Sequence, residues 1–251
     1  MSIIPPGLSR LLQFYLSGPM PCPYLPGQVE RKLFTRLVNE TDTNAEVNGM
    51  LTRAGFRRSH DIAYRPACAE CNACTPVRIP VRLFTPSRTQ KRIAARNRAF
   101  TFAPMPAEVT DEVFALFRAY QNTRHADSDM AHMTREDVAQ MLADSTAGTR
   151  LYGLRDPAGA LLGGIIVDPV GDGASAVYSF FAPDMPERSL GTQLVLSLID
   201  LMRSENLPYV YLGYWIAASR KMAYKAKFQP LQALTPQGWE LLVSPPPRGE
   251  S

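Results

Sequence analysis

Apolar residues recur along the chain with two periods, one near 3.6 residues and one of two residues. The longer period predicts helices over residues 45–54, 88–97, 108–124, 135–143 and 189–204. The shorter period and runs of β-formers predict strands over residues 31–37, 57–64, 77–83, 150–155, 160–168, 174–181 and 209–212. Pro80 interrupts one of these strands, so we expect that strand at the edge of its sheet. The mixture of elements indicates an α+β fold.

The second half of the chain has an element order that bears on function. Three strands joined by short turns predict an antiparallel meander, and helix 189–204 then allows a crossover. We therefore expect strand 209–212 to lie parallel to strand 174–181. Residues 217–227 are good helix formers with four cations and no acid, which predicts a cationic helix. This order resembles the GNAT acyltransferase fold, in which two parallel strands splay apart where an acyl donor meets an amine.

The four cysteines are the densest chemical signal in the sequence. Cys68, Cys71 and Cys74 are two residues apart from one another, and Cys22 lies between two prolines. Such spacing turns successive sulfurs toward one centre, so it favours a metal or cluster over disulfides. Four thiolates suit tetrahedral zinc, and the spacing is also typical of an iron-sulfur cluster. Reduced thiols without a metal are the alternative, and a catalytic cysteine is disfavoured because no histidine is near in sequence.

Length and charge favour a chain of two parts. The 251 residues are enough for two modest domains, and the net charge of +4 divides unevenly along them. Residues 1–100 hold 15 Lys and Arg against 6 Asp and Glu, whereas residues 101–251 hold 12 against 17. We therefore expect a basic, cysteine-bearing N-terminal α/β domain over 1–100, which attracts a polyanion, and a GNAT-like domain over 101–251.

The sequence contains no pattern typical of a targeting signal or a membrane span. Residues 1–6 lack a basic region followed by an apolar run, and no apolar stretch reaches the length that a span requires. We therefore expect a soluble cytoplasmic protein with no membrane partner and no DNA partner.

Eight short motifs follow one another in order, at residues 21–26, 56–58, 64–66, 76–79, 86–88, 175–178, 188–192 and 209–216. Together they resemble the bacterial aspartate/glutamate leucyltransferases, relatives of the arginyl-tRNA-protein transferases, over about residues 8–240. The resemblance implies transfer of an aminoacyl group, typically leucine, from charged tRNA to the α-amine of proteins that begin with Asp or Glu. This N-end rule reaction marks those proteins for degradation. The resemblance also implies a GNAT-like domain after a cysteine-bearing one, with no coenzyme A.

The implied reaction needs little base catalysis. An α-amine has a pKa of about 7.7 to 8.0, so part of it is already neutral at cytoplasmic pH. The site must orient the amine and the ester and stabilise an oxyanion. We predict Tyr178, Tyr214 and Tyr224 as hydrogen-bond donors or proton relays, with a purely structural phenol as the alternative for each.

Cationic side chains are predicted for both substrates. An acidic acceptor residue requires a paired cation, and the candidates are Arg65, Arg78, Lys221 and Lys225. For tRNA, the predicted helix 88–97 presents a stripe of cations able to follow a phosphate backbone, made of Arg88, Lys91, Arg92 and Arg96. Ordinary solvated surface charges are the alternative in each case.

Two other functions compete with the transferase. The first is a GNAT N-acetyltransferase that uses acetyl-CoA, but Gln193 stands where its pyrophosphate loop requires a small residue. The second is a non-enzymatic zinc-dependent RNA-binding module, which explains the cysteines and the cations but not the aromatic-rich second half. Whether leucine or arginine is the donated residue stays open at this point.

Overall fold

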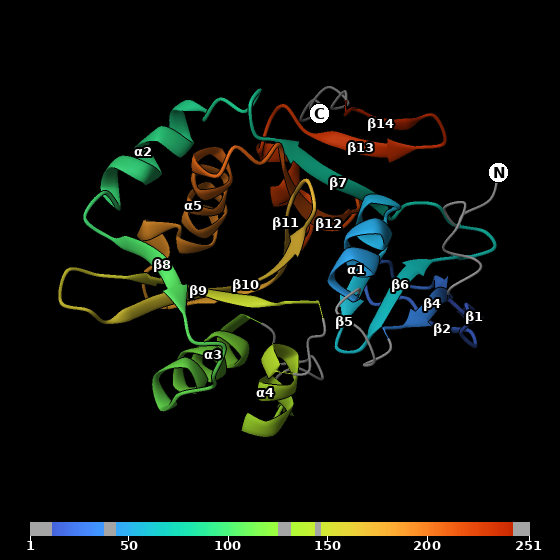
Figure 1. Cartoon of the computed structure of the whole chain (residues 1–251), viewed down its shortest axis with the longest axis horizontal. Coiled ribbons are helices and arrows are strands. Elements are labelled where there is room, and N and C mark those ends of the chain that lie inside the picture. The colour runs from blue at the N-terminus through green and yellow to red at the C-terminus, as the bar shows by residue number, and fades with distance from the viewer. Residues whose placement is uncertain (1–11, 38–43, 125–131, 144–146, 243–251) are drawn as a thin grey trace.

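The computed structural model describes residues 12–37, 44–124, 132–143 and 147–242. An eight-stranded sheet forms its centre, with strand order β14-β13-β7-β12-β11-β10-β9-β8 (Figure 1). The strands are β7 (Thr75–Pro80), β8 (Thr101–Met105), β9 (Arg150–Arg155), β10 (Leu161–Val170), β11 (Gly173–Phe181), β12 (Tyr209–Trp215), β13 (Gln232–Thr235) and β14 (Gly238–Leu241). Strands β11 and β12 are parallel, and the other neighbours are antiparallel.

Helices cover both faces of this sheet (Figure 1). The helix α5 (Leu190–Ser204) packs on one face beside α2 (Arg88–Arg96), while α3 (Asp111–Arg124) and α4 (Arg135–Ala143) cover the other. A hydrophobic core lies on each face of the sheet. Successive side chains of a strand point to opposite faces, so neighbouring residues of β10 pack into different cores. Ile165 joins the core under α5, and Ile166 joins the core under α3.

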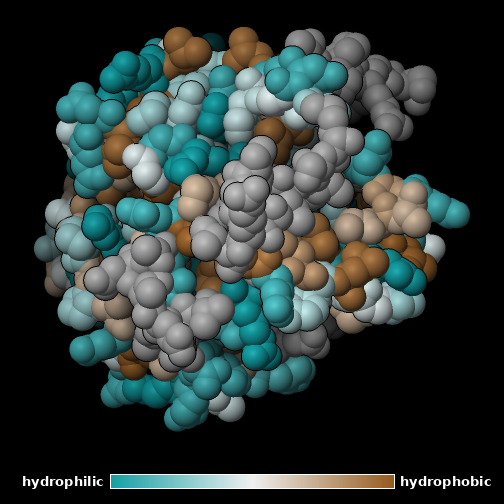
Figure 2. Space-filling view, turned by 45° about the vertical axis from the view of Figure 1, so that its right-hand side comes forward, coloured by the Kyte–Doolittle hydropathy of each residue, from teal (hydrophilic) through white to brown (hydrophobic). Residues whose placement is uncertain are grey.

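A smaller N-terminal unit lies beside the large sheet (Figure 1). Its sheet has the order β1-β4-β6-β5, and a hairpin of β2 and β3 adjoins it. Its elements are β1 (Tyr15–Leu16), β2 (Met20–Pro21), β3 (Val29–Glu30), β4 (Lys32–Arg36), α1 (Asn44–Arg53), β5 (Arg57–Ser59) and β6 (Ile62–Pro66). Leu51 and Phe56 belong to its own small core. Apolar residues on β1, β2 and β3 are exposed to solvent. Figure 2 shows hydrophobic residues, in brown, on the right-hand side of the molecule.

A buried ion pair joins the small unit to the large sheet. Arg58 of β5 donates to both carboxylate oxygens of Asp168 on β10, at 2.6 and 2.9 Å. Thr149 and Asn48 donate to the same carboxylate, at 2.6 and 3.2 Å. The side chains of Arg58 and Asp168 are 3% and 1% exposed, so this cluster fixes how β5 and α1 sit against β10.

The predicted helices and strands are confirmed with few exceptions, including the parallel pairing of β11 with β12. The predicted edge position of the Pro80 strand is wrong, because β7 lies between β13 and β12. Pro80 is the last residue of β7, and the next amide, that of Val81, donates to the Pro208 carbonyl. The backbone hydrogen bonding between β7 and the β12 segment therefore continues past Pro80, although Pro80 has no N–H group to donate.

The predicted helix over residues 217–227 is also wrong. Only a 3-10 turn, η4 (Ala223–Lys227), forms there. Lys225 and Phe228 are 3% and 1% exposed, so both are held in the interior. This packing overrides the helix propensity of the segment, as tertiary contacts commonly do.

The predicted division into residues 1–100 and 101–251 stays a prediction. Strands from both ranges build the large sheet, since β7 comes from the first and the other seven strands from the second. Among the described residues, no helix is long and apolar enough to cross a membrane.

Candidate active site

The two parallel strands of the large sheet separate partway along their length. Their pairing ends where Ser175 lies opposite Tyr211, and no further pair joins β11 to β12 among the described residues. A register irregularity between Tyr211 and Gly213, in the pairing of β12 with β7, accompanies the separation. The C-terminal half of each strand thus presents backbone groups that lack the other strand as partner. We call this opening between β11 and β12 the splay.

Arg57 occupies the splay. Its Nη2 donates a hydrogen bond of 2.8 Å to the Val177 carbonyl of β11. On the β12 side, a Cβ added to Gly213 would lie 3.4 Å from Cδ and from Nη1 of Arg57. Gly213 has a φ of 71°, which glycine adopts without strain. The guanidinium therefore takes the place of β12 as the partner of a β11 carbonyl.

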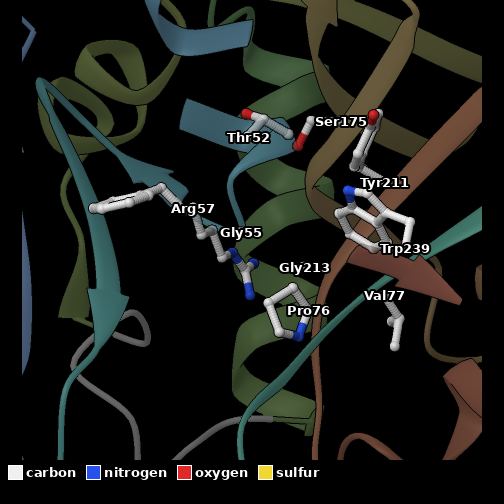
Figure 3. A pocket seen from close by; sticks show the side chains of 11 residues that line it. Thr52, Gly55, Arg57, Pro76, Val77, Ser175, Tyr211, Gly213 and Trp239 are labelled. Atoms are coloured by element: carbon white, nitrogen blue, oxygen red, sulfur yellow. The ribbon is translucent and has the colours of Figure 1, made fainter. Parts of the chain in front are cut away.

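The pocket at the splay is small once Arg57 is in place (Figure 3). Both the N-terminal unit and the large sheet line it, through residues that include Gly55, Arg57, Pro76, Ser175 and Trp239. Its volume is about 10 Å³, roughly the room that one water molecule needs. A substrate group that enters here thus meets strand backbone and the Arg57 guanidinium.

Tyr214, one of the predicted catalytic tyrosines, joins the two units. It is 2% exposed, and its hydroxyl lies 2.9 Å from the Gly55 carbonyl and 3.0 Å from the Tyr64 carbonyl. Burial raises the pKa of this phenol well above its usual value, so it stays protonated and donates. These contacts give Tyr214 a structural task, and its predicted catalytic role stays a prediction.

Tyr178 and Tyr224, the other two predicted tyrosines, occupy opposite environments. Tyr178 lies on β11 next to Val177, and its hydroxyl accepts a hydrogen bond of 2.7 Å from Gln121 of α3. Burial also raises the pKa of Tyr178, and no acceptor for its own hydrogen is found among the described residues. Tyr224 is 43% exposed. Tyr178 and Tyr224 therefore each keep a phenolic hydrogen that no described acceptor receives, and Tyr178 lies beside the splay on β11.

Lys225 is the most buried of the cations predicted to bind the acceptor. It is 3% exposed, and its Nζ donates a hydrogen bond of 2.6 Å to the Tyr214 carbonyl of β12. Burial first, and then the positive charge of Arg57, hold the pKa of Lys225 well below its usual value. The structure thus brings Lys225 into the electrostatic range of Arg57.

The other predicted acceptor-binding cations lie apart from one another. The Arg78 guanidinium is sandwiched between Tyr209 and Trp239, with its central carbon 3.5 and 4.4 Å from their ring centroids. Arg65 donates a hydrogen bond of 3.3 Å to the Ala54 carbonyl. Lys221 is exposed. The structure therefore groups Lys225 with Arg57, while roles in acceptor binding for the other three stay predictions.

The cations predicted to bind tRNA all lie exposed on α2, at Arg88, Lys91, Arg92 and Arg96. Ser87 caps the start of this helix, and its capping box with Gln90 is complete. At the other end, Arg96 donates to the Glu187 carbonyl, and Asn97 donates to the Arg188 carbonyl at 2.9 Å. Both carbonyls directly precede α5, so the cationic stripe of α2 leads to the N-terminus of α5.

The four cysteines gather in the N-terminal unit. Burial raises the pKa of the Cys74 thiol to about 11, with smaller contributions from Cys22, Cys68 and Cys71. The thiols therefore lie near enough to influence one another, and as a donor set they suit a soft metal. Within the described ranges, however, no three His, Cys, Asp or Glu side chains are arranged as ligands. The metal or cluster stays a prediction.

Arg57 is the site residue that the sequence analysis missed. It belongs to one of the eight motifs, the Phe-Arg-Arg at residues 56–58, but the pattern around it predicts only a strand. Its position depends on a contact with Val177, 120 residues further along the chain. The motif itself was the available signal, because both of its arginines reach the large sheet, Arg57 at Val177 and Arg58 at Asp168.

Comparisons with known proteins agree over most of the chain. Two family models match, "Arginine-tRNA-protein transferase, N terminus" over residues 20–92 and "Arginine-tRNA-protein transferase, C terminus" over residues 112–235. The aspartate/glutamate leucyltransferase of Parvibaculum lavamentivorans is 51% identical over 92% of this chain and 95% of its own. That of Paramagnetospirillum magneticum is 48% identical over 93% and 95%.

Solved structures give a weaker likeness. L-PGS from Bacillus licheniformis is 12% identical over 57% of this chain and 46% of its own, with a TM-score of 0.46, too low to argue from. The sequence relatives and the two family models are decisive, and they confirm the resemblance carried by the eight motifs. The chain belongs to the aspartate/glutamate leucyltransferase family.

Proposed function

We propose that this protein transfers leucine from charged tRNA to the α-amine of proteins that begin with Asp or Glu. The observation that carries the proposal is the splay between β11 and β12, with a guanidinium in it and a helix N-terminus beyond its open end. Membership of the family makes the enzyme an aminoacyltransferase that acts through aminoacyl-tRNA.

The order of elements around the splay supports a GNAT-like domain. The antiparallel strands β9, β10 and β11 lead through α5 to the parallel strand β12, as in that fold. Because parallel strands run in the same direction, β11 and β12 both separate toward their C-terminal ends. Residues 182–189, which include the 3-10 turn η3 (Pro186–Arg188), join β11 to α5, and Gly191 of α5 lies against Phe181 at the end of β11. The N-terminus of α5 therefore lies at the open end of the splay.

Delivery of the tRNA end follows from the position of α2. Its exposed cations can follow the phosphate backbone of an acceptor stem, and Arg96 brings that stripe to the start of α5. A helix N-terminus favours negative charge, so it favours the terminal phosphates of the RNA. The esterified 3′ end is thereby directed toward the splay.

The chemistry at the splay is acyl transfer from an ester to an amine. The neutral amine attacks the ester carbonyl and forms a tetrahedral oxyanion. The bond from the carbonyl carbon to the ribose oxygen then breaks, the nitrogen loses a proton, and the ribose oxygen takes up a proton and leaves as a hydroxyl. Tyr178, whose raised pKa keeps its proton in place, suits hydrogen bonding to that oxyanion. The backbone carbonyls of Val177 and Tyr214 each accept a hydrogen bond from a cation.

A coenzyme A site is disfavoured at the same helix start. Gln193 lies in the first turn of α5, where its side chain accepts from Asn97 at 3.3 Å and donates to Ser197 at 3.1 Å. These bonds hold a large side chain where an N-acetyltransferase needs bare backbone to grip pyrophosphate. The N-acetyltransferase alternative is therefore not favoured.

We further propose that Cys22, Cys68, Cys71 and Cys74 hold zinc or an iron-sulfur cluster. The mutual influence of their thiols supports this proposal, and it gives the metal a structural role in the N-terminal unit. Elemental analysis and a visible spectrum of anaerobically purified protein distinguish zinc, iron and free thiols. Protein with neither metal, at full transfer activity, would contradict the assignment.

The decisive experiment measures labelled leucine moving from Leu-tRNA to peptides that differ only in their first residue. We expect labelling of peptides beginning with Asp or Glu and none of a peptide beginning with Ala. Arg-tRNA offered in the same assay tests which amino acid is donated. Lack of labelling of the acidic peptides would refute the proposed function.

A further inference from the structure

Two cationic side chains meet at the splay, each held by a carbonyl of a different strand. The Lys225 ammonium donates to the Tyr214 carbonyl of β12 at 2.6 Å. The Arg57 guanidinium donates to the Val177 carbonyl of β11 at 2.8 Å. Gly213, which lies against Arg57, is the neighbour of Tyr214 in β12, so both cations converge on the same part of that strand.

Among the residues that the structure describes, no carboxylate forms an ion pair with Arg57 or Lys225. The ionisable groups that act on Arg57 are the phenols of Tyr24, Tyr64, Tyr214 and Tyr224, which are uncharged near neutral pH. Lys225 is buried and Arg57 is half-buried, and two like charges brought together there without an anion are costly, so the arrangement favours the arrival of a negative group.

The pair also has unused hydrogen-bond donors. A guanidinium has five N–H groups and an ammonium has three. Within the described part of the chain, Arg57 and Lys225 each donate one hydrogen bond. The remaining donors suffice for both oxygens of a carboxylate, which a guanidinium can bind through two parallel bonds.

We propose that Arg57 and Lys225 bind the side-chain carboxylate of the acceptor's first residue. This inference rests on the proposed function, which supplies an acceptor beginning with Asp or Glu. The carboxylate enters the water-sized pocket that Arg57 lines, and the α-amine of the same residue then lies at the splay. A phosphodiester of tRNA continues on both sides, whereas a carboxylate ends a short side chain and can enter a pocket of this size end-on.

The test compares two peptides that differ only in beginning with Asp or Asn. In the unmodified protein we expect strong preference for Asp. In Lys225→Gln and in Arg57→Gln we expect the KM of the Asp peptide to rise roughly tenfold to 100-fold, which corresponds to the loss of a charge-assisted hydrogen bond. The KM of the Asn peptide, which has no carboxylate to bind, should rise less.

Matched controls remove a cation outside the splay. Lys227→Gln changes an exposed lysine in the same turn η4, and Arg36→Gln changes an exposed arginine at the end of β4. Both should keep the preference for Asp. Lys225→Arg should also keep much of the preference for Asp, because the positive charge remains. If a glutamine variant fails to fold, the Lys225→Arg variant supplies the test of the carboxylate site instead.

The outcomes are distinct. An unmodified protein that labels neither acidic peptide would refute the proposed function itself. Normal labelling with undiminished preference for Asp in Lys225→Gln and Arg57→Gln would overturn the carboxylate site alone. A rise in the KM for Leu-tRNA, with that of the Asp peptide unchanged, would overturn it in favour of an RNA phosphate.

Discussion

Lys225 combines deep burial with a second cation nearby, and both effects disfavour its protonated form. Its pKa is therefore held well below its usual value. The groups that face it are Arg57, the carbonyl of Tyr214 and the ring of Tyr224, whose centroid is 6.0 Å from Nζ. None of these groups, the ones that the described part of the chain brings to Lys225, is an anion near neutral pH, so a bound carboxylate would favour the protonated lysine.

The pH dependence of acceptor binding follows. Below the pKa of Lys225 in the free protein, the ammonium is already present, and the KM of an Asp peptide should be constant. Above that pKa, binding must take up a proton, so the KM should rise with pH by up to about tenfold per pH unit. Steady-state kinetics with Asp and Asn peptides between pH 6 and 9 measure this. Parallel KM profiles for the two peptides would contradict the prediction.

The turnover number should also rise with pH, and this rise opposes the effect of the rising KM on kcat/KM. The acceptor amine has a pKa of about 7.7 to 8.0, so kcat should rise with pH through that range for every acceptor. In Lys225→Arg the KM of the Asp peptide should no longer change with pH, because arginine does not titrate in this range.

Gly213 is the second residue on which the splay depends. Gly213→Ala should lower the free energy of unfolding by about 1 kcal/mol, because alanine is strained at a φ of 71°. Any loss of transfer should be small, since the added Cβ would lie at an ordinary van der Waals distance, 3.4 Å, from Arg57. Urea unfolding and the KM of the Asp peptide measure the two effects.

Gly159→Ala is the matched control for this change. Gly159 has a φ of 89°, but a Cβ there would meet nothing within 4 Å. We expect a similar loss of stability with normal transfer. Equal loss of transfer in both variants would show that strain, and not the contact with Arg57, is responsible.

At the scale of elements, α2 should determine tRNA affinity. In the double variant Lys91→Gln with Arg92→Gln, binding of Leu-tRNA should weaken, and the slope of log K against log salt should fall by about 0.7 to 0.9 for each lost phosphate contact. Filter binding across a salt series measures it. The variant Arg36→Gln with Arg150→Gln removes the same charge from exposed positions off α2 and should leave the slope unchanged. Equal slopes in all three proteins would contradict tRNA binding along α2.

The elements themselves were largely predictable, whereas the site was predictable only in part. Helix α5 and strand β10 follow from local periodicity, which a sequence displays directly. The helix predicted over residues 217–227 is wrong because Lys225, which propensity places on an exposed helix, turns inward to β12. Arg57 escaped notice because its position depends on a partner 120 residues away. Local pattern predicts elements, but not which side chains of distant elements meet.

At the scale of the whole molecule, the buried pair of Arg58 and Asp168 determines how the two units are joined. Asp168→Asn should lower the free energy of unfolding by about 3 to 5 kcal/mol, because it leaves the Arg58 charge buried without its partner. Transfer should fall as well, since Arg58 adjoins Arg57 in β5. Urea unfolding measures the first effect.

Asp200→Asn is the control for that prediction. Asp200 pairs with Arg203 at 2.6 Å, but its side chain is 72% exposed, and pairs of this kind contribute about 1 kcal/mol or less. A loss in Asp168→Asn no larger than that in Asp200→Asn would show that the two units are held together by other contacts.

The place of β7 between β12 and β13 has a consequence for biosynthesis. When Pro80 leaves the ribosome, its neighbour Tyr209 is still 129 residues from being made. At about 5 to 20 residues per second, β7 waits roughly 6 to 26 s for the strand on that side. Pro76 and Pro80 each lack a backbone N–H, which limits pairing of the nascent strand with foreign partners during this interval. Pro80, from which an edge position was predicted, thus helps Pro76 to protect a central strand before its partner strand is made.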